Sequence, residues 1–320
     1  MQLPRCSPRT YRRITLVALI MLSVIVVTGG AVRLTGSGLG CTDWPACEND
    51  RLVAPLEYHA MVEFVNRTFT GLLSLSVMFA VLGSLVRVPR RRDLTWWSLG
   101  LVAGMIGQIV LGGITVLVEL SPPFVMAHFL LSMVIIWNAV VLHHLAGQPE
   151  TAARSLVSPE LRWMGRLMVA SAALAIFLGT VVTGAGPHGG DAEVERLDLV
   201  VGEVVRFHGG SVILFGLITV ATLWMLKRRD ELTPDILKRG EILLVVLVAQ
   251  AGVGYAQYFL GVPIGLVAIH LAGSVCVWIS VLAFELGLHT HPAPVGAEGG
   301  PAPVADDAPP AAATPVPAAG

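Results

Sequence analysis

Residues 250–274, QAGVGYAQYFLGVPIGLVAIHLAGS, are the best guide to the fold of this chain. They place a single histidine, His270, inside an apolar run. Residues 108–132, QIVLGGITVLVELSPPFVMAHFLLS, do the same with His128. In both stretches the histidine follows the first glutamine by 20 residues. The sequence therefore predicts two copies of one structural unit, each with one buried imidazole.

The chain is too apolar for a water-soluble globular protein. Of its 320 residues 54% are hydrophobic and 13% are charged, and the mean hydropathy is +0.74. A helix needs roughly 20 mostly apolar residues to cross a bilayer. Such runs lie at residues 14–32, 61–86, 96–118, 124–144, 163–183, 204–226, 242–260 and 263–288. We therefore expect an all-α membrane protein with eight transmembrane helices, arranged as two four-helix bundle repeats.

Basic residues gather on one side of the predicted membrane. Sixteen of the 21 Lys and Arg residues precede the first apolar run or lie in or beside the connections that follow the second, fourth and sixth runs. The positive-inside rule makes that side cytoplasmic and places both termini there. Because four spans is an even number, both repeats cross the membrane in the same, parallel orientation. A net charge of −1 gives no indication of a nucleic-acid partner, and we expect none.

These spans predict the domain organisation. We expect a cytoplasmic N-terminus at 1–13, an N-terminal bundle at 14–147 with an external cysteine loop at 33–60, a cytoplasmic linker at 148–162, a C-terminal bundle at 163–288 and a disordered Pro/Ala-rich cytoplasmic tail at 289–320. The external loop is longer than the joining of two helices requires, which is typical of a functional loop.

Two of the four cysteines, Cys41 and Cys47, lie in that external loop, where an oxidising compartment allows a disulfide. Such a pair is either a structural staple or a redox-active bridge that exchanges with another thiol. Cys6 and Cys276 fall on the cytoplasmic side and inside the last span, so we interpret both as ordinary thiols.

His208 and His270 lie at matching depth on alternate helices of the C-terminal bundle. Helix bundles hold cofactors between facing helices, and two imidazoles in a dry apolar site suit a low-spin haem. The alternative is that each histidine only hydrogen-bonds to a neighbouring helix. The other histidines near the cytoplasmic ends are expected to be solvated: His143, His144, His289 and His291.

The N-terminal bundle offers an unequal pair. Glu63 and Asn66 stand about where the other bundle has His208, and neither is a usual haem ligand. A haem beside His128 would then have one strong ligand and an open opposite position, which suits a substrate. Glu63 is either a catalytic carboxylate or the partner of Arg67 in an i,i+4 salt bridge.

Five pieces of the chain resemble haem A synthases, in particular their actinobacterial branch. They are VVTGGAVRLTGSGLGCTDWPAC, VEFVNR, GQIVLGGITV with AHFLLS, RFHGG, and AGVGYAQYFLG with IHLAGS. The resemblance covers residues 15–288. It implies an oxidoreductase of the bacterial cell membrane that converts the C8 methyl of haem O to the formyl group of haem A, for cytochrome c oxidase. Successive hydroxylations would give an unstable gem-diol that loses water.

The same resemblance implies roles for particular residues. His208 and His270 would hold a permanent haem b, with the substrate haem beside His128, and Glu63 would match the glutamate of an E-x-x-H-R motif. Cys41 and Cys47 would match a loop pair of many bacterial members. The implied partner is haem O as the substrate. A haem O synthase and an electron acceptor are further possible partners, and the chain could form an oligomer.

One residue departs from that family pattern. The motif's histidine is Asn66 here, so we predict a substrate haem that is five-coordinate or assisted by asparagine. Arg33, Arg67 and Arg206 lie at the external rim, where they could pair with haem propionates. Two other functions stay open: a dihaem cytochrome b that only passes electrons, and a transporter without a cofactor.

Overall fold

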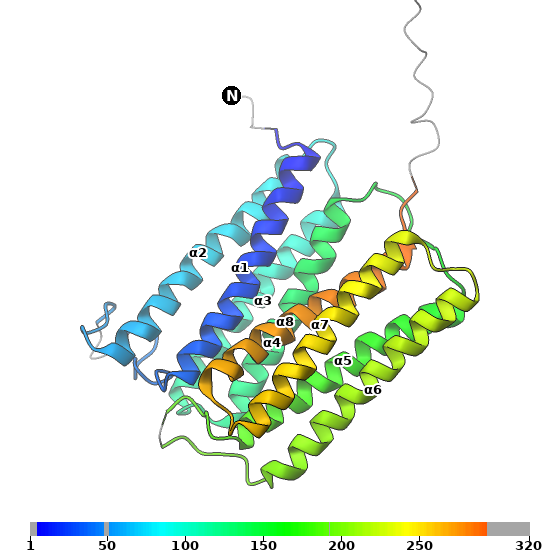
Figure 1. The fold of residues 1–320 in the computed structure, drawn as a ribbon. Helices are drawn as coiled ribbons and strands as arrows, with labels where there is room; N and C mark the ends of the chain where they lie inside the picture. Colours follow the sequence, from blue (N-terminus) through cyan, green and yellow to red (C-terminus); the bar gives the residue numbers. More distant parts are fainter. Residues whose placement is uncertain (1–4, 48–50, 192, 293–320) are drawn as a thin grey trace, which may run out of the picture.

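The computed structural model describes residues 5–47, 51–191 and 193–292, and the regular structure in this part of the chain is almost all helix (Figure 1). The helices are α1 Pro8–Leu34, α2 Tyr58–Val86, α3 Arg92–Leu117, α4 Pro122–Ala146, α5 Pro159–Ala185, α6 Val201–Arg228, α7 Pro234–Phe259 and α8 Ile264–Gly287. All eight are long and apolar enough to span a membrane. The prediction of an all-α, multi-pass membrane protein is confirmed.

Several helices begin earlier than their apolar runs, because polar first turns continue the helix beyond the hydrocarbon region. The clearest case is α7, which begins at Pro234 instead of Ile242. The side chain of Thr233 accepts a hydrogen bond from the Ile236 amide at 3.3 Å and so caps the helix, and Pro234 occupies its first position. Ser7 caps α1 in the same way through the Thr10 amide.

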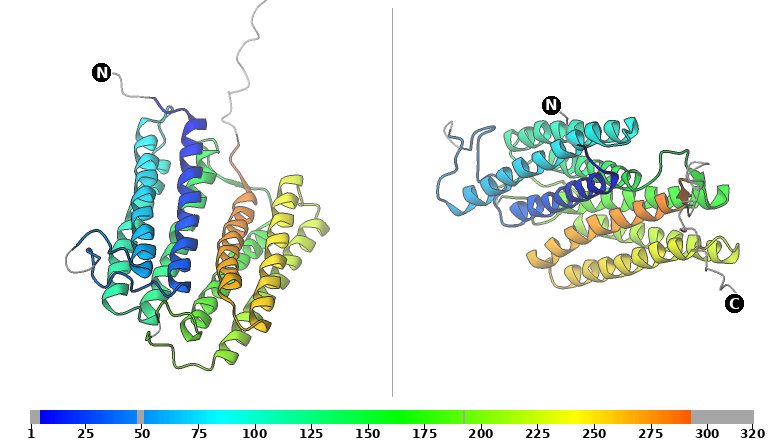
Figure 2. Two further views of the ribbon diagram at one scale, coloured as in Figure 1. Left: turned by 60° about the vertical axis from the view of Figure 1, so that its left-hand side comes forward. Right: turned by 90° about the horizontal axis from the view of Figure 1, so that it is seen from above.

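The helices form two groups in chain order, α1–α4 and α5–α8, which lie side by side (Figures 1 and 2). Their interface is built mainly from α4 and α8, together with α1. The indole Nε1 of Trp278 in α8 donates to the carbonyl oxygen of Met133 in α4 at 2.9 Å. In α1, a Cβ added to Gly30 would overlap the side chain of Leu271 in α8. The fold thus consists of two bundles pressed together over their lengths.

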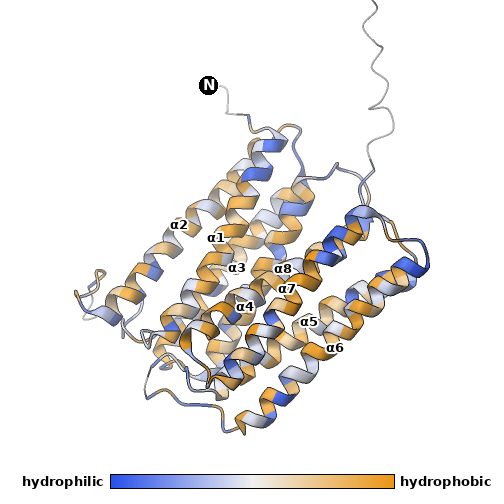
Figure 3. Cartoon of the chain, viewed as in Figure 1, coloured by the Kyte–Doolittle hydropathy of each residue, from blue (hydrophilic) through white to orange (hydrophobic). Residues whose placement is uncertain are grey.

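Polar residues collect toward the two ends of the bundles, and the middle parts of the helices are apolar (Figure 3). At the end that carries the start of α1 and the end of α8, arginines bind the carbonyl oxygens of neighbouring helices. Arg91 donates to Leu145 at 3.0 Å, and Arg239 donates to Ala283 at 2.9 Å. The cytoplasmic position of this end stays a prediction.

The predicted tail and linker differ from the structure at their edges. Arg154–Ser155 (β1) pairs antiparallel with His289–Thr290 (β2), so residues 289–292 are ordered against the connection between the bundles. Residues 293–320 of the predicted disordered tail lie outside the described residues. The linker predicted for 148–162 ends sooner, because α5 begins at Pro159.

The four histidines that were expected to be solvated are partly exposed. His143 shares a hydrogen bond with the Thr15 hydroxyl at 3.0 Å, and His291 Nδ1 donates to the Thr151 carbonyl at 2.8 Å. The His144 ring lies 6.4 Å from that of His291. The ordered residues after α8 thus contact His144 and the connection between the bundles at this end.

Candidate functional site

The C-terminal bundle brings the rings of His208 in α6 and His270 in α8 together, with the planes nearly perpendicular. Their ring centroids are 6.3 Å apart, and the ring planes make an angle of 83°. His208 Nδ1 lies 3.0 Å from the carbonyl oxygen of Ala175 in α5. A carbonyl only accepts, so the ring proton sits on Nδ1 and Nε2 keeps its lone pair. His208 is therefore prepared to act as a ligand through Nε2.

This spacing fits a haem iron between the two rings. Two imidazoles bound to opposite faces of one iron, with iron–nitrogen bonds of about 2 Å, have ring centroids roughly 6 Å apart. His270 Nδ1 is buried and has no hydrogen-bond partner among the described residues. An unpartnered buried nitrogen is costly in an apolar interior, but iron bound through Nε2 would not satisfy Nδ1. The spacing of the two rings is therefore the observation that favours a metal here.

The N-terminal bundle repeats this arrangement with one substitution. His128 in α4 precedes His270 by 142 residues, and Asn66 in α2 precedes His208 by the same 142. The Asn66 carbonyl oxygen accepts a hydrogen bond from the Thr28 hydroxyl of α1 at 2.8 Å. His128 Nδ1 is buried without a partner in the described part of the chain. The repeat therefore offers one imidazole and one amide where the other bundle offers two imidazoles.

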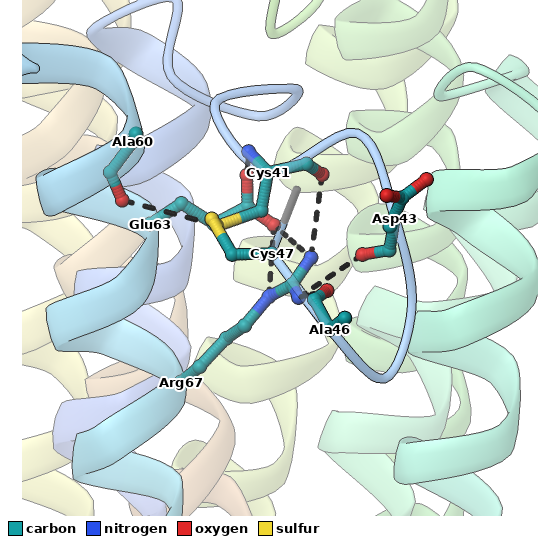
Figure 4. A network of polar contacts seen from close by, with 7 residues as sticks. All are labelled: Cys41, Asp43, Ala46, Cys47, Ala60, Glu63 and Arg67. Carbon is teal, nitrogen blue, oxygen red and sulfur yellow. Dashed lines mark hydrogen bonds and ion pairs between the residues drawn. A yellow bond between two sulfur atoms is a disulfide. The ribbon is translucent and has the colours of Figure 1, made fainter. Parts of the chain in front are cut away.

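The loop between α1 and α2, predicted to be external, closes into a small ring through the Cys41–Cys47 disulfide (Figure 4). Glu63 in α2 is 6% exposed, and its carboxylate accepts from the Cys41 amide at 2.8 Å. The same carboxylate accepts from the Arg67 guanidinium at 2.6 and 3.0 Å. The predicted i,i+4 salt bridge is present, and it lies directly beneath the disulfide.

Arg67 extends from α2 into this ring of chain (Figure 4). Its guanidinium donates to the carbonyl oxygens of Ala46 at 3.0 Å, Asp43 at 3.3 Å and Cys41 at 3.4 Å. Each of its three nitrogens thus contacts Glu63 or a loop carbonyl. Arg67 therefore holds the loop in place. The pairing of Arg67 with a haem propionate stays a prediction.

The loop also reaches α3 through Trp44. A Cβ added to Gly113 would lie 2.8 Å from the indole ring, so the two are in close contact. The preceding residue, Gly112, lies against His128: its added Cβ would be 3.1 Å from Cε1 of that ring. The disulfide loop is therefore one helix residue away from the histidine of the N-terminal bundle.

The two long external loops meet at the same end of the molecule. The Gly38 amide donates to the Gly190 carbonyl at 3.0 Å. Arg33, another predicted propionate partner, donates instead to the carbonyl oxygens of Gly189 at 3.0 Å and Thr183 at 3.2 Å. Arg206, the third, lies exposed on α6. These contacts connect the outer ends of the two bundles.

The two remaining histidines, His59 and His188, also belong to this outer layer. His59 Nδ1 shares a hydrogen bond with the Ser37 hydroxyl at 2.9 Å, and His188 Nε2 donates to the Val262 carbonyl at 2.8 Å. Both rings tie loops to helix ends.

The helices and the paired imidazoles define a class: a multi-pass helical membrane protein with a two-histidine centre in one of two repeated bundles. A profile of cytochrome oxidase assembly proteins matches residues 12–60 and 52–187, together more than half of the chain. The chain belongs to this family. His208 and His270 lie beyond the matched residues, so their interpretation depends on the repeat and the geometry.

Curated relatives carry the name "Heme A synthase". The protein of Exiguobacterium sibiricum is 27% identical over 122 residues, which are 38% of this chain and 41% of that protein. That of another Exiguobacterium species is 23% identical over 242 residues, 73% of this chain and 78% of the relative. That of Lysinibacillus sphaericus is 22% identical over 169 residues, 52% and 55% of the two chains. The match to the first of these spans less than half of the relative's length.

Proposed function

We propose that this chain is a haem A synthase, an oxidoreductase that converts the C8 methyl of haem O to a formyl group for cytochrome c oxidase. The observation that carries the proposal is the 6.3 Å separation of the His208 and His270 rings, which suits one iron between them. Membership of a family of cytochrome oxidase assembly proteins and the names of the relatives support it.

In this proposal the C-terminal bundle holds a resident haem b. His208 and His270 would hold its iron, and the Ala175 carbonyl fixes the tautomer of His208. When bound, the haem iron supplies one-electron oxidation and reduction. The surrounding helices exclude water and lipid headgroups from the rings.

The N-terminal bundle holds haem O beside His128. Asn66, tied to Thr28 through its carbonyl oxygen, presents its NH₂ group as a hydrogen-bond donor and leaves one axial position without a protein ligand. Such a site holds a haem by one bond and releases it more readily than two axial bonds would, as a substrate requires. The disulfide loop with Trp44 closes its outer side.

Glu63 is the residue that the sequence predicts as the catalytic carboxylate. Both of its oxygens accept hydrogen bonds, from the Cys41 amide and from Arg67. We therefore propose that Glu63 positions the disulfide loop over the substrate haem, and that the loop shields the methyl group under oxidation from bulk water. We further propose the bacterial cell membrane as the location, with both termini in the cytoplasm, because the basic residues lie at that end.

The test is a haem extraction. The chain is expressed in a host that makes haem O and lacks its own haem A synthase, and membrane pigments are separated by chromatography. A formyl-bearing haem is expected with the wild-type chain and none with His128→Ala. If the wild-type protein contains haem yet leaves haem O unaltered, it is a dihaem cytochrome b instead. A colourless purified protein would support the cofactor-free transporter.

A further inference from the structure

Each of the three interior histidines rests against a glycine of the preceding helix. His128 lies on Gly112, His208 on Gly179 and His270 on Gly254. In all three cases the ring atom nearest to the glycine is Cε1, at 3.1, 3.3 and 3.1 Å from the position that a Cβ would take. Carbon atoms in comfortable contact are about 3.5–4.0 Å apart. An added methyl group would therefore require the ring or the helix to shift by a few tenths of an ångström.

The residue one helical turn before each glycine makes a second contact with the same histidine. Gln108 Nε2 donates to the His128 carbonyl at 3.0 Å, and Gln250 Nε2 donates to the His270 carbonyl at 2.8 Å. In the third case, the Ala175 carbonyl accepts from His208 Nδ1. The polar group and the glycine, four positions apart, face the histidine from one side of one helix.

Asn66, which replaces a histidine in the repeat, lacks this support. The α1 glycine beside it is Gly29, whose added Cβ would lie 3.9 Å from Asn66 Nδ2, an ordinary contact distance. Its hydrogen bond comes from the Thr28 side chain. Close glycine contact therefore accompanies the three imidazoles and is absent from the amide.

We propose that Gly112, Gly179 and Gly254, with the residues four positions before them, form three seats that set the orientation of the histidine rings. A seat is here the pair of a glycine and the residue four positions earlier. The inference rests on the proposed function, because orientation matters only if the rings bind iron. Ligand histidines in general need such outer contacts to fix their rings and tautomers.

The N-terminal seat has a further feature. Gln108 Oε1 and His128 Nδ1 are both buried without hydrogen-bond partners among the described residues. One is an acceptor and the other can carry a proton, and Gln108 already contacts the backbone of His128.

The experiment compares two glycines of one helix. Gly254→Ala adds a methyl group beneath His270, whereas Gly252→Ala adds the same group where no atom lies within 4 Å. Both changes have the same effect on intrinsic helix propensity. The purified holoprotein of each variant is examined for haem affinity and for the g-values of its low-spin iron by electron paramagnetic resonance.

We expect Gly254→Ala to shift the g-values and to weaken haem binding roughly tenfold, as overpacking of a tight contact does, whereas Gly252→Ala matches the wild type. Gln250→Leu removes the donor to the His270 carbonyl and should shift the g-values while haem is retained. This variant provides the test if Gly254→Ala does not fold. If the g-values were unchanged in both Gly254→Ala and Gln250→Leu, the proposal that these seats orient the histidine rings would be wrong. A wild-type protein without low-spin haem would overturn the proposed function itself.

Discussion

The two bundles have the same four-helix arrangement but differ at one interior position and in one loop. The C-terminal bundle places His208 opposite His270, whereas the N-terminal bundle has Asn66 and His128 at the positions 142 residues earlier. Only the N-terminal bundle carries a disulfide loop, held by Glu63 and Arg67. In the proposed function, this difference would let one bundle hold a resident haem and the other admit and release a substrate haem.

The structural change between these two roles is small. Both bundles keep the contact between a glutamine and the histidine backbone, at 3.0 and 2.8 Å, and the close glycine beneath the ring. Loss of one imidazole removes one axial bond, and the scaffold around it stays. The contrast between the bundles can therefore be tested by single substitutions.

The largest effect is expected from His208→Ala or His270→Ala. Either change removes one axial ligand of the proposed resident haem, so the low-spin absorption spectrum of the purified protein should disappear entirely. His128→Ala is the matched control and should leave that spectrum in place. If the Soret band of the double variant His208→Ala/His270→Ala is that of the wild type, the contrast between the bundles has no basis.

Asn66→His tests the contrast from the other side. A histidine here supplies the missing ligand, so the substrate haem should change from high spin to low spin in its absorption and resonance spectra. Thr28→Val is the control, because it removes the hydrogen bond to Asn66 and adds no ligand. An unchanged spin state in Asn66→His would show that position 66 does not face the iron.

Glu63→Gln should loosen the disulfide loop. The variant loses the charge that binds Arg67, at a cost of about 2 kcal/mol, less than the 3–5 kcal/mol of a fully buried pair because a quarter of the Arg67 side chain is exposed. We expect the Cys41–Cys47 bond to be reduced at least tenfold faster by a membrane-impermeant phosphine. Arg229→Ala, which breaks an exposed pair with Glu160 at the other end of the molecule, should not change that rate. If the wild type, Glu63→Gln and Arg229→Ala were reduced at the same rate, contacts other than the Glu63–Arg67 pair would hold the loop in position.

The smallest effect concerns the interface between the bundles. Trp278→Phe removes the hydrogen bond to the Met133 carbonyl and should destabilise the protein by about 1 kcal/mol. Thermal unfolding in detergent measures the shift as a midpoint lower by a few degrees. Trp96 is 72% exposed, and Trp96→Phe should leave the midpoint unchanged. A shift of equal size in both variants would count against this bond.

The fold could be predicted from the sequence because apolar length alone decides how many helices cross a membrane. The resemblance to haem A synthases is confirmed at the level of the family, and the spacing of Glu63 and Arg67 predicted their salt bridge. Helix ends such as Pro234 could not be placed from the apolar runs, because a cap and a polar first turn leave no trace in hydropathy.

The surroundings of the site were harder to predict. The carbonyls of Cys41 and Ala46 that receive Arg67 belong to irregular backbone, whose course no periodicity gives. The seats leave a trace in the sequence, since Gln108 and Gly112 recur as Gln250 and Gly254 at the offset of the histidines. The recurrence alone does not reveal the contact, because a glycine signals a close approach only once its neighbour is known.

The fit of Leu271 against Gly30 joins the two centres. Leu271 directly follows His270 in α8, and Gly30 lies two residues after Thr28, the partner of Asn66. In the proposed function, an electron passing between the two haem sites would have a route along bonded atoms of α8, across the contact between Leu271 and Gly30, and along bonded atoms of α1.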